Sequence, residues 1–137
     1  MAVIAIDTNV LVRFLVRDDE AQFLAASKLI YDCIANSQPV LISLLVMLEA
    51  EWVLRSRYKI SKLEIAAVFN KLLESKEAIF EDEESLEESL QTWKESSADF
   101  ADCLIVAKSR RLGCSSLMTF DSKASALPGA QLLNSKN

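Results

Sequence analysis

Apolar residues in this chain occur either in short uninterrupted runs or in longer stretches at helical spacing. Short runs without alternation are typical of strands buried on both faces of a parallel sheet. Such runs predict strands at 3–6, 40–42, 78–80, 115–120 and 130–133. Stretches at helical spacing predict helices at 8–16, 19–35, 44–58, 62–75, 81–95 and 98–113. The alternation of strands and helices predicts an α/β fold in which helices cover both faces of a parallel sheet.

Several of the predicted helices have boundary signals in the sequence. A side chain that accepts hydrogen bonds from the first helical N–H groups marks a start, and a glycine after the last turn marks an end. These signals are the capping pairs Asp19 with Gln22 and Ser61 with Glu64, the single cap Ser43 and the terminal Gly113. Because the 137 residues include only two glycines and two prolines, we expect long regular elements in a single domain over 1–137.

The net charge of −5 comes from one segment of the chain. Residues 81–95 hold seven acids and one lysine, whereas the rest of the chain carries thirteen acids and fourteen bases. The acidic balance therefore describes one solvated helix face. It does not exclude a nucleic-acid partner, although no basic stripe indicates one.

The cysteines, the absence of histidine and the length of the apolar runs each exclude a class of protein. Three cysteines without a CxxC pair, and no histidine, argue against a zinc site and against a disulfide framework. Asp7 and Arg13 interrupt the first apolar run, and no stretch approaches about 18 apolar residues. We therefore expect a cytoplasmic protein that has no signal peptide and no membrane span.

Two aspartates directly follow predicted strands. Asp7 comes after the strand at 3–6, and Asp121 after the strand at 115–120. Each aspartate can simply cap the helix that follows, or it can be a functional group, because reactive side chains collect outside the carboxyl ends of parallel strands. Two independent strands placing a carboxylate at the same edge of the sheet favour a functional site.

Glu49 and Glu51 form a second group of candidate carboxylates. Glu49 lies too deep in the helix at 44–58 to cap it, and Glu51 is about 200° further around the helix axis. One of them should therefore face solvent and the other the interior, where a carboxylate must be paired or bound to a metal. The pattern alone does not choose between them.

Asp99 and Asp102 are three residues apart at the start of the last long helix, so they share a face. Asp99 can cap this helix or complete a capping box with Ser96. Asp102 adjoins the apolar stretch CLIVA, so a capping role explains its position less well. We expect Asp102 to be the inward functional residue and Asp99 to support it.

Acidic side chains gathered without histidine are typical of sites for Mg²⁺ or Mn²⁺, which prefer carboxylate and water oxygens. Such an ion lowers the pKa of a bound water and neutralises charge on a phosphoryl oxygen. Without a cation, the carboxylates would raise one another's pKa values. The chain has no GxxxxGK[ST], GxGxxG or GxSxG motif for a competing chemistry. The sequence therefore predicts a Mg²⁺ site acting on a phosphodiester.

Four segments together resemble the PIN-domain ribonucleases, and most closely the VapC-type toxins of type II toxin–antitoxin pairs. They are IDTNVLVRFL at 6–15, LLVMLEAEWVLRSRY at 44–58, DFADCLIVA at 99–107 and LMTFD at 117–121. The resemblance implies a PIN-like three-layer sandwich with about five parallel strands in a central sheet and helices on both faces. It also implies Mg²⁺- or Mn²⁺-dependent endonucleolytic cleavage of single-stranded RNA.

The resemblance also assigns roles to residues. By position, the four family acids, as metal ligands and catalytic residues, are Asp7, Glu49, Asp102 and Asp121, so it selects Glu49 over Glu51. Asn9 matches a polar companion of the first acid. The partners that the resemblance implies are an RNA substrate, a cognate antitoxin and a second copy of the chain in a homodimer.

Substrate contacts are best sought among the basic residues near these segments. Arg13 and Arg17 follow Asp7 closely and are the best candidates for phosphate contacts, although they can equally be ordinary solvated charges.

Three other functions fit the sequence less well than a ribonuclease does. An aspartate-nucleophile phosphatase commonly needs a second aspartate two residues after the first, where this chain has Asn9. A non-catalytic PIN-fold interaction module should have lost at least one of the four acids, and all four are present. A flap-type DNA nuclease needs a larger acidic set and DNA-binding insertions that this chain lacks.

Overall fold

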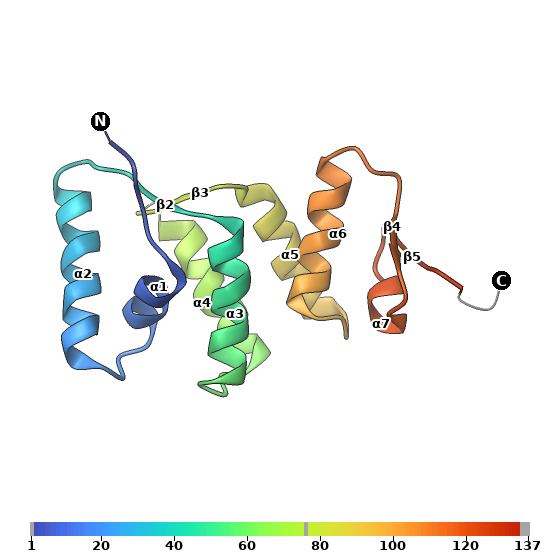
Figure 1. Ribbon diagram of the computed structural model, residues 1–137, viewed down its shortest axis with the longest axis horizontal. Coiled ribbons are helices and arrows are strands. Elements are labelled where there is room, and N and C mark those ends of the chain that lie inside the picture. Colours follow the sequence, from blue (N-terminus) through green and yellow to red (C-terminus); the bar gives the residue numbers. More distant parts are fainter. Residues whose placement is uncertain (1, 76, 135–137) are drawn as a thin grey trace. The chain divides into compact units, whose positions relative to one another are not determined.

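All five predicted strands are present in the computed structural model, which describes residues 2–75 and 77–134 (Figure 1). The chain forms two compact parts, the N-terminal part Met1–Asp82 and the C-terminal part Glu83–Asn137. All strand pairs are parallel, in a three-stranded sheet in the first part and a two-stranded sheet in the second. The α/β class with parallel strands is thereby confirmed, and the single-domain assignment over 1–137 stays a prediction.

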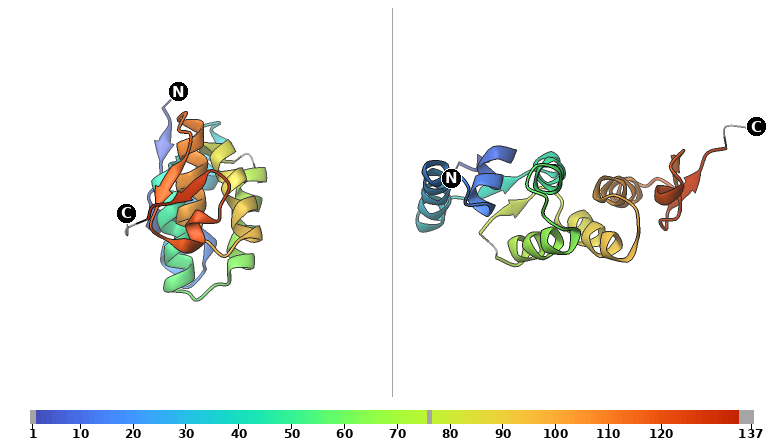
Figure 2. Two further views of the ribbon diagram at one scale, coloured as in Figure 1. Left: turned by 90° about the vertical axis from the view of Figure 1, so that its right-hand side faces the viewer. Right: turned by 90° about the horizontal axis from the view of Figure 1, so that it is seen from below.

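The N-terminal part contains three strands and four helices among its described residues. They are β1 (Ile4–Ala5), α1 (Thr8–Leu15), α2 (Glu20–Ala35), β2 (Val40–Ile42), α3 (Leu44–Ser56), α4 (Lys62–Ser75) and β3 (Ile79–Phe80). The strand order is β1–β2–β3, with Ile4 opposite Val40 and Leu41 opposite Ile79. Figures 1 and 2 show α1 and α3 on one side of these strands and α4 on the other. Helices therefore cover both faces of this sheet, as the uninterrupted apolar strands predicted.

The core of the N-terminal part is built from the apolar faces of its helices and from the strands. Leu11, Ile42, Met47, Ile65 and Phe69 are among its fully buried side chains. The predicted caps hold these helices in place: the side chains of Asp19, Ser43 and Ser61 accept from the N–H groups of Gln22, Val46 and Glu64. The sequence signals for these helix starts are confirmed.

The C-terminal part contains α5 (Glu83–Glu95), α6 (Phe100–Arg111), β4 (Leu117–Thr119), α7 (Ser122–Ser125) and β5 (Ala130–Leu132). Helices α5 and α6 pack through apolar side chains, with the rings of Trp93 and Phe100 5.2 Å apart between centroids. At the polar edge of this contact, Arg111 pairs with Glu84 at 3.0 Å and Arg110 with Glu88 at 2.7 Å. The acidic helix face is therefore partly neutralised by basic residues in the last turn of α6.

Helix α6 ends as predicted, and one helix was missed. Gly113 has a φ of +91°, a left-handed conformation that glycine adopts without strain, and its N–H donates to the carbonyl of Arg110. The four-residue helix α7 was not predicted because a segment this short has no periodic pattern. Over the described residues, no helix is long and apolar enough to cross a membrane.

Candidate functional site

Asp7 ends the stretch that follows β1 and caps α1. Its backbone is extended, and the N–H of Val10 donates to Oδ1 at 3.0 Å. The cap uses Oδ1 alone, so Oδ2 of this exposed carboxylate is not used by the helix. The two interpretations of Asp7, cap or ligand, are therefore compatible in one side chain, because the cap bond uses Oδ1 and does not use Oδ2.

Asp121 repeats this arrangement after β4. The N–H groups of Lys123 and Ala124 both donate to Oδ1, at 2.8 and 2.9 Å, and the Asp121 N–H donates to Thr119 Oγ1 at 3.0 Å. Capping again uses one carboxylate oxygen and leaves the other outside the cap. The chain thus follows a parallel strand with the same carboxylate-capped turn in each compact part.

Asp99 and Asp102 belong to the same part as Asp121. Asp99 occupies the N-cap position of α6, but its side chain makes no capping hydrogen bond. Asp102, in the first turn, is half-buried, and its pKa is raised above the usual aspartate value. Burial is the largest cause, followed by the negative charges of Asp99 and Asp121, and a backbone hydrogen bond at Asp99 opposes the rise. In the C-terminal part, Asp102 is therefore affected by the negative charges of Asp99 and Asp121.

The two glutamates of α3 point in different directions. Glu51 is the inward residue, with 2% of its side chain exposed, and Arg55 Nε donates to its Oε2 at 2.7 Å. Glu49 is exposed, on a helix surface that also exposes Leu45 and Trp52. The sequence predicted that one of the two glutamates is buried, and this residue is Glu51. Its ion pair with Arg55 compensates the buried charge, so no metal is needed to explain it. Glu49 stays a prediction based on the resemblance.

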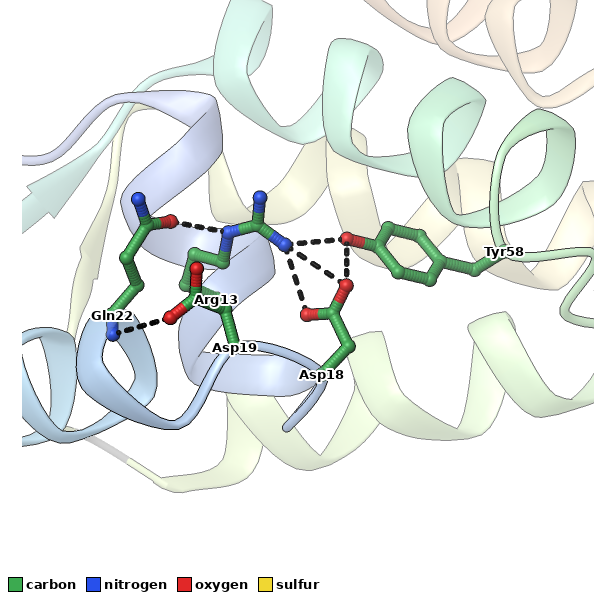
Figure 3. A network of polar contacts seen from close by, with 5 residues as sticks. All are labelled: Arg13, Asp18, Asp19, Gln22 and Tyr58. Carbon is green, nitrogen blue, oxygen red and sulfur yellow. Dashed lines mark hydrogen bonds and ion pairs between the residues drawn. The ribbon is translucent and has the colours of Figure 1, made fainter.

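Arg13 is held in a network of side chains from α1, α2, the segment between them and the segment that follows α3 (Figure 3). Its Nη1 donates to both carboxylate oxygens of Asp18, at 2.9 and 3.0 Å, and to Tyr58 Oη at 2.8 Å; Nε donates to Gln22 Oε1 at 2.6 Å. Tyr58 Oη in turn donates to Asp18 at 2.8 Å. The pKa of Asp18 is lowered, first by the Tyr58 hydrogen bond and then by Arg13. Asp18 and Tyr58 were missed from the sequence, because 40 residues separate them.

Arg17 has a different environment. Its Nε and Nη2 donate to the two carboxylate oxygens of Glu20, at 2.9 and 2.6 Å, and its guanidinium lies 4.5 Å from the centroid of the Phe23 ring. Both predicted phosphate contacts are thus already paired with acids of their own chain. This pairing reduces the charge that each of them offers to a substrate.

A cleft of about 370 Å³ lies between α1 and α2. Its lining residues are Asp7, Asn9, Val10, Arg13, Gln22, Ala25, Ala26 and Leu29. The structure therefore brings together three predicted site residues of the first segment: Asp7, Asn9 and Arg13. Glu49 and Arg17 do not line this cleft.

The donor chemistry is that of a hard cation, since every predicted ligand is a carboxylate. Within the described residues of either compact part, no three His, Cys, Asp or Glu side chains lie close enough together to hold a metal ion. The negative charges of Asp99 and Asp121 nevertheless act on Asp102.

Residues 4–130 match the model of the PIN domain family, and the chain belongs to this family. PIN domains are generally metal-dependent nucleases that bind nucleic-acid substrates, which defines the broad class of this protein. A search of curated proteins finds no match to this chain.

Proposed function

We propose that this protein is an endoribonuclease that cleaves single-stranded RNA with Mg²⁺ or Mn²⁺, and that it is the toxin of a type II toxin–antitoxin pair of the VapC type. Its catalytic residues and metal ligands are Asp7, Glu49, Asp102 and Asp121. Asn9 and Asp99 support them. A cognate antitoxin and a second copy of the chain are its protein partners, and the cytoplasm is its compartment.

The observation that carries this proposal is the carboxylate-capped turn after β1 and after β4. In each turn Oδ1 accepts the capping bonds and fixes the group, so that Oδ2 of Asp7 and Oδ2 of Asp121 are held for a ligand without further ordering of the side chain. A serine, threonine or asparagine would cap as well, but only aspartate adds the negative charge that a divalent cation requires. The PIN family match over 4–130 supports the same chemistry.

The raised pKa of Asp102 supports a cation in the same way. Burial and the charges of Asp99 and Asp121 disfavour the ionised carboxylate, and a bound cation would reverse this effect. When bound, Mg²⁺ or Mn²⁺ supplies positive charge against a phosphoryl oxygen and favours deprotonation of water. The four acids are the side chains that would bind the cation, and Arg13 would orient the RNA phosphate.

The test is cleavage of a mixed single-stranded RNA by wild type and Asp7→Asn, with Mg²⁺ or Mn²⁺ and then with a chelator. Asparagine caps helices as well as aspartate does, so the variant should fold normally. Losing a charged ligand should lower the cleavage rate by about a hundredfold or more. Asp19→Asn is the matched control, because Asp19 caps α2 in the same way but lies outside the proposed site.

Each result has a definite meaning. Cleavage by wild type and Asp19→Asn, lost in Asp7→Asn and in chelator, supports the proposal. Equal activity in Asp7→Asn, or activity that survives the chelator, contradicts it. Hydrolysis of a small phosphate ester without cleavage of RNA would instead favour a phosphohydrolase. Metal binding without hydrolysis of either substrate would favour an interaction module.

A further inference from the structure

The cleft between α1 and α2 contains groups that the proposed metal chemistry does not use. Of its lining residues, only Asp7 is among the four proposed ligands. Its volume of about 370 Å³ is within the range of small-molecule sites, at the lower end. The cleft therefore has room for one residue of a substrate chain beside the proposed ligand.

The apolar wall of this cleft suits a flat ring. Val10 lies on the α1 side, and Ala25, Ala26 and Leu29 lie on the α2 side. The two alanines leave space where a longer side chain would fill it. An aromatic base can bury one face against such a wall and keep its polar edge accessible.

The polar groups of the cleft match the edge of a nucleobase. Asn9 and Gln22 each carry an amide, which has both a donor and an acceptor. Gln22 Oε1 accepts from Arg13 Nε, and this bond orients the amide with its Nε2 as the remaining donor. Among the described residues, the Asn9 side chain has no hydrogen-bond partner. Two amides of this kind can read the Watson–Crick edge of an unpaired base.

Arg13 provides a fixed cation at the same cleft. Its contacts to Asp18, Tyr58 and Gln22 use Nε and Nη1, so Nη2 takes no part in them (Figure 3). Only 26% of this side chain is exposed, which is consistent with a guanidinium held in one orientation. Nη2 is therefore a preorganised donor for a phosphate oxygen.

We propose that this cleft binds one ribonucleotide of the substrate strand. The base lies against the apolar wall, the amides of Asn9 and Gln22 bond its edge, and Arg13 Nη2 bonds its phosphate. Asp18 and Tyr58 are positioning residues that act through Arg13. The inference rests on the proposed function, because it takes RNA as the substrate, and it adds a nucleotide subsite to the four acids.

The first experiment measures binding without cleavage. Each of the four ribonucleoside 5′-monophosphates is added to the metal-free protein, and the side-chain amide signals of Asn9 and Gln22 are followed by NMR. Both signals should shift with at least one nucleotide. Ala25→Leu should abolish the shifts by filling the cleft, whereas Ala21→Leu, on the same helix but outside the cleft, should not. Unchanged signals with all four nucleotides, or equal shifts with inorganic phosphate, would overturn the proposal.

The second experiment tests whether Tyr58 positions Arg13 for substrate binding. Tyr58→Phe removes the hydroxyl that accepts from Arg13 and donates to Asp18. We expect KM for RNA to rise about three- to tenfold, the worth of one hydrogen bond, with kcat unchanged. Tyr31→Phe is the matched control, because Tyr31 is the chain's other tyrosine and does not line the cleft.

The two proposals can fail separately. If the protein cleaves RNA and Tyr58→Phe leaves KM unchanged, the nucleotide subsite is wrong and the nuclease function stands. If nucleotides shift the Asn9 and Gln22 signals but no RNA is cleaved, the subsite stands and the nuclease function is wrong.

Discussion

Glu49 and Glu51 lie on the same helix but have different environments. Glu51 is buried and is balanced by Arg55 one helical turn away, which is a structural role. Glu49 is exposed and contributes little to packing. A buried carboxylate that loses its partner destabilises a protein strongly, whereas an exposed one can be changed freely. The structure therefore separates a residue that affects stability from one that is expected to affect activity.

Replacing Arg55 with methionine should lower the free energy of unfolding by about 2 kcal/mol, because Glu51 would stay buried without its cation. Because 45% of the Arg55 side chain is exposed, we expect this loss of stability to be smaller than for a fully buried ion pair. Urea unfolding measures the change. The double variant Arg55→Met with Glu51→Leu should recover much of the loss, and a double variant as unstable as Arg55→Met would contradict the role of the pair.

Glu49→Gln should leave the free energy of unfolding within about 0.5 kcal/mol of wild type. Under the proposed function, it should nevertheless lower RNA cleavage by about tenfold or more, because a metal ligand loses its charge. The two measurements are made on one preparation. Full activity in this variant would remove Glu49 from the proposed site and reopen the choice among the acids of α3.

Among the secondary-structure elements, α6 begins with two acids, Asp99 at the N-cap and Asp102 in the first turn. A helix N-terminus normally stabilises acids, and Asp102 lies in the first turn. Its pKa is nevertheless raised, so burial and the repulsion from Asp99 and Asp121 outweigh the favourable terms. The folded protein thus takes up a proton at Asp102 more readily than the unfolded chain does. Ionisation of Asp102 therefore opposes folding.

Stability should therefore decline as the pH rises from the usual aspartate pKa through the raised pKa of Asp102. Asp102→Asn should remove this decline. Without metal it should be slightly more stable than wild type at neutral pH, by less than about 1 kcal/mol because the group is partly screened by solvent. The difference should vanish in acid. Urea unfolding from about pH 3 to 7 tests this, with Asp19→Asn as the control, and a variant less stable at neutral pH would contradict it.

The elements themselves could be predicted because their signals are local. Asp19, Ser43 and Ser61 cap helices within three residues of their own positions, and Gly113 ends α6 through its own backbone conformation. Strand β2 matches its apolar run, whereas the other four strands are shorter than theirs, as β1 (Ile4–Ala5) within 3–6 shows. The direction of Glu49 and Glu51 depends on packing around α3, which helical spacing alone does not contain.

At the scale of the whole molecule, most arginines form ion pairs with acidic residues of the same chain. Arg13, Arg17, Arg55, Arg110 and Arg111 each pair with an acid of the same compact part. Long-range attraction of a polyanion is therefore weak, and recognition should depend on a few local contacts. This agrees with the absence of a basic stripe in the sequence. The side-chain pairs themselves could not be predicted, since Tyr58 and Asp18 lie 40 residues apart.

Binding of a short single-stranded RNA to the metal-free protein should accordingly depend only weakly on salt. With one or two phosphate contacts, the logarithm of the binding constant should fall with the logarithm of salt concentration with a slope of about −1. Arg13→Gln should reduce the slope by about 0.7. Fluorescence anisotropy over a salt series measures both. A slope of about −4 or steeper would indicate an extended basic surface instead.

The aspartate caps after β1 and β4 also bear on how this protein can change over generations. In the genetic code, one base separates aspartate from asparagine, and both residues cap a helix. A single mutation at Asp7 or Asp121 can therefore silence the proposed chemistry and leave the fold intact. Under the proposed function, one such mutation would remove nuclease activity without producing a misfolded protein.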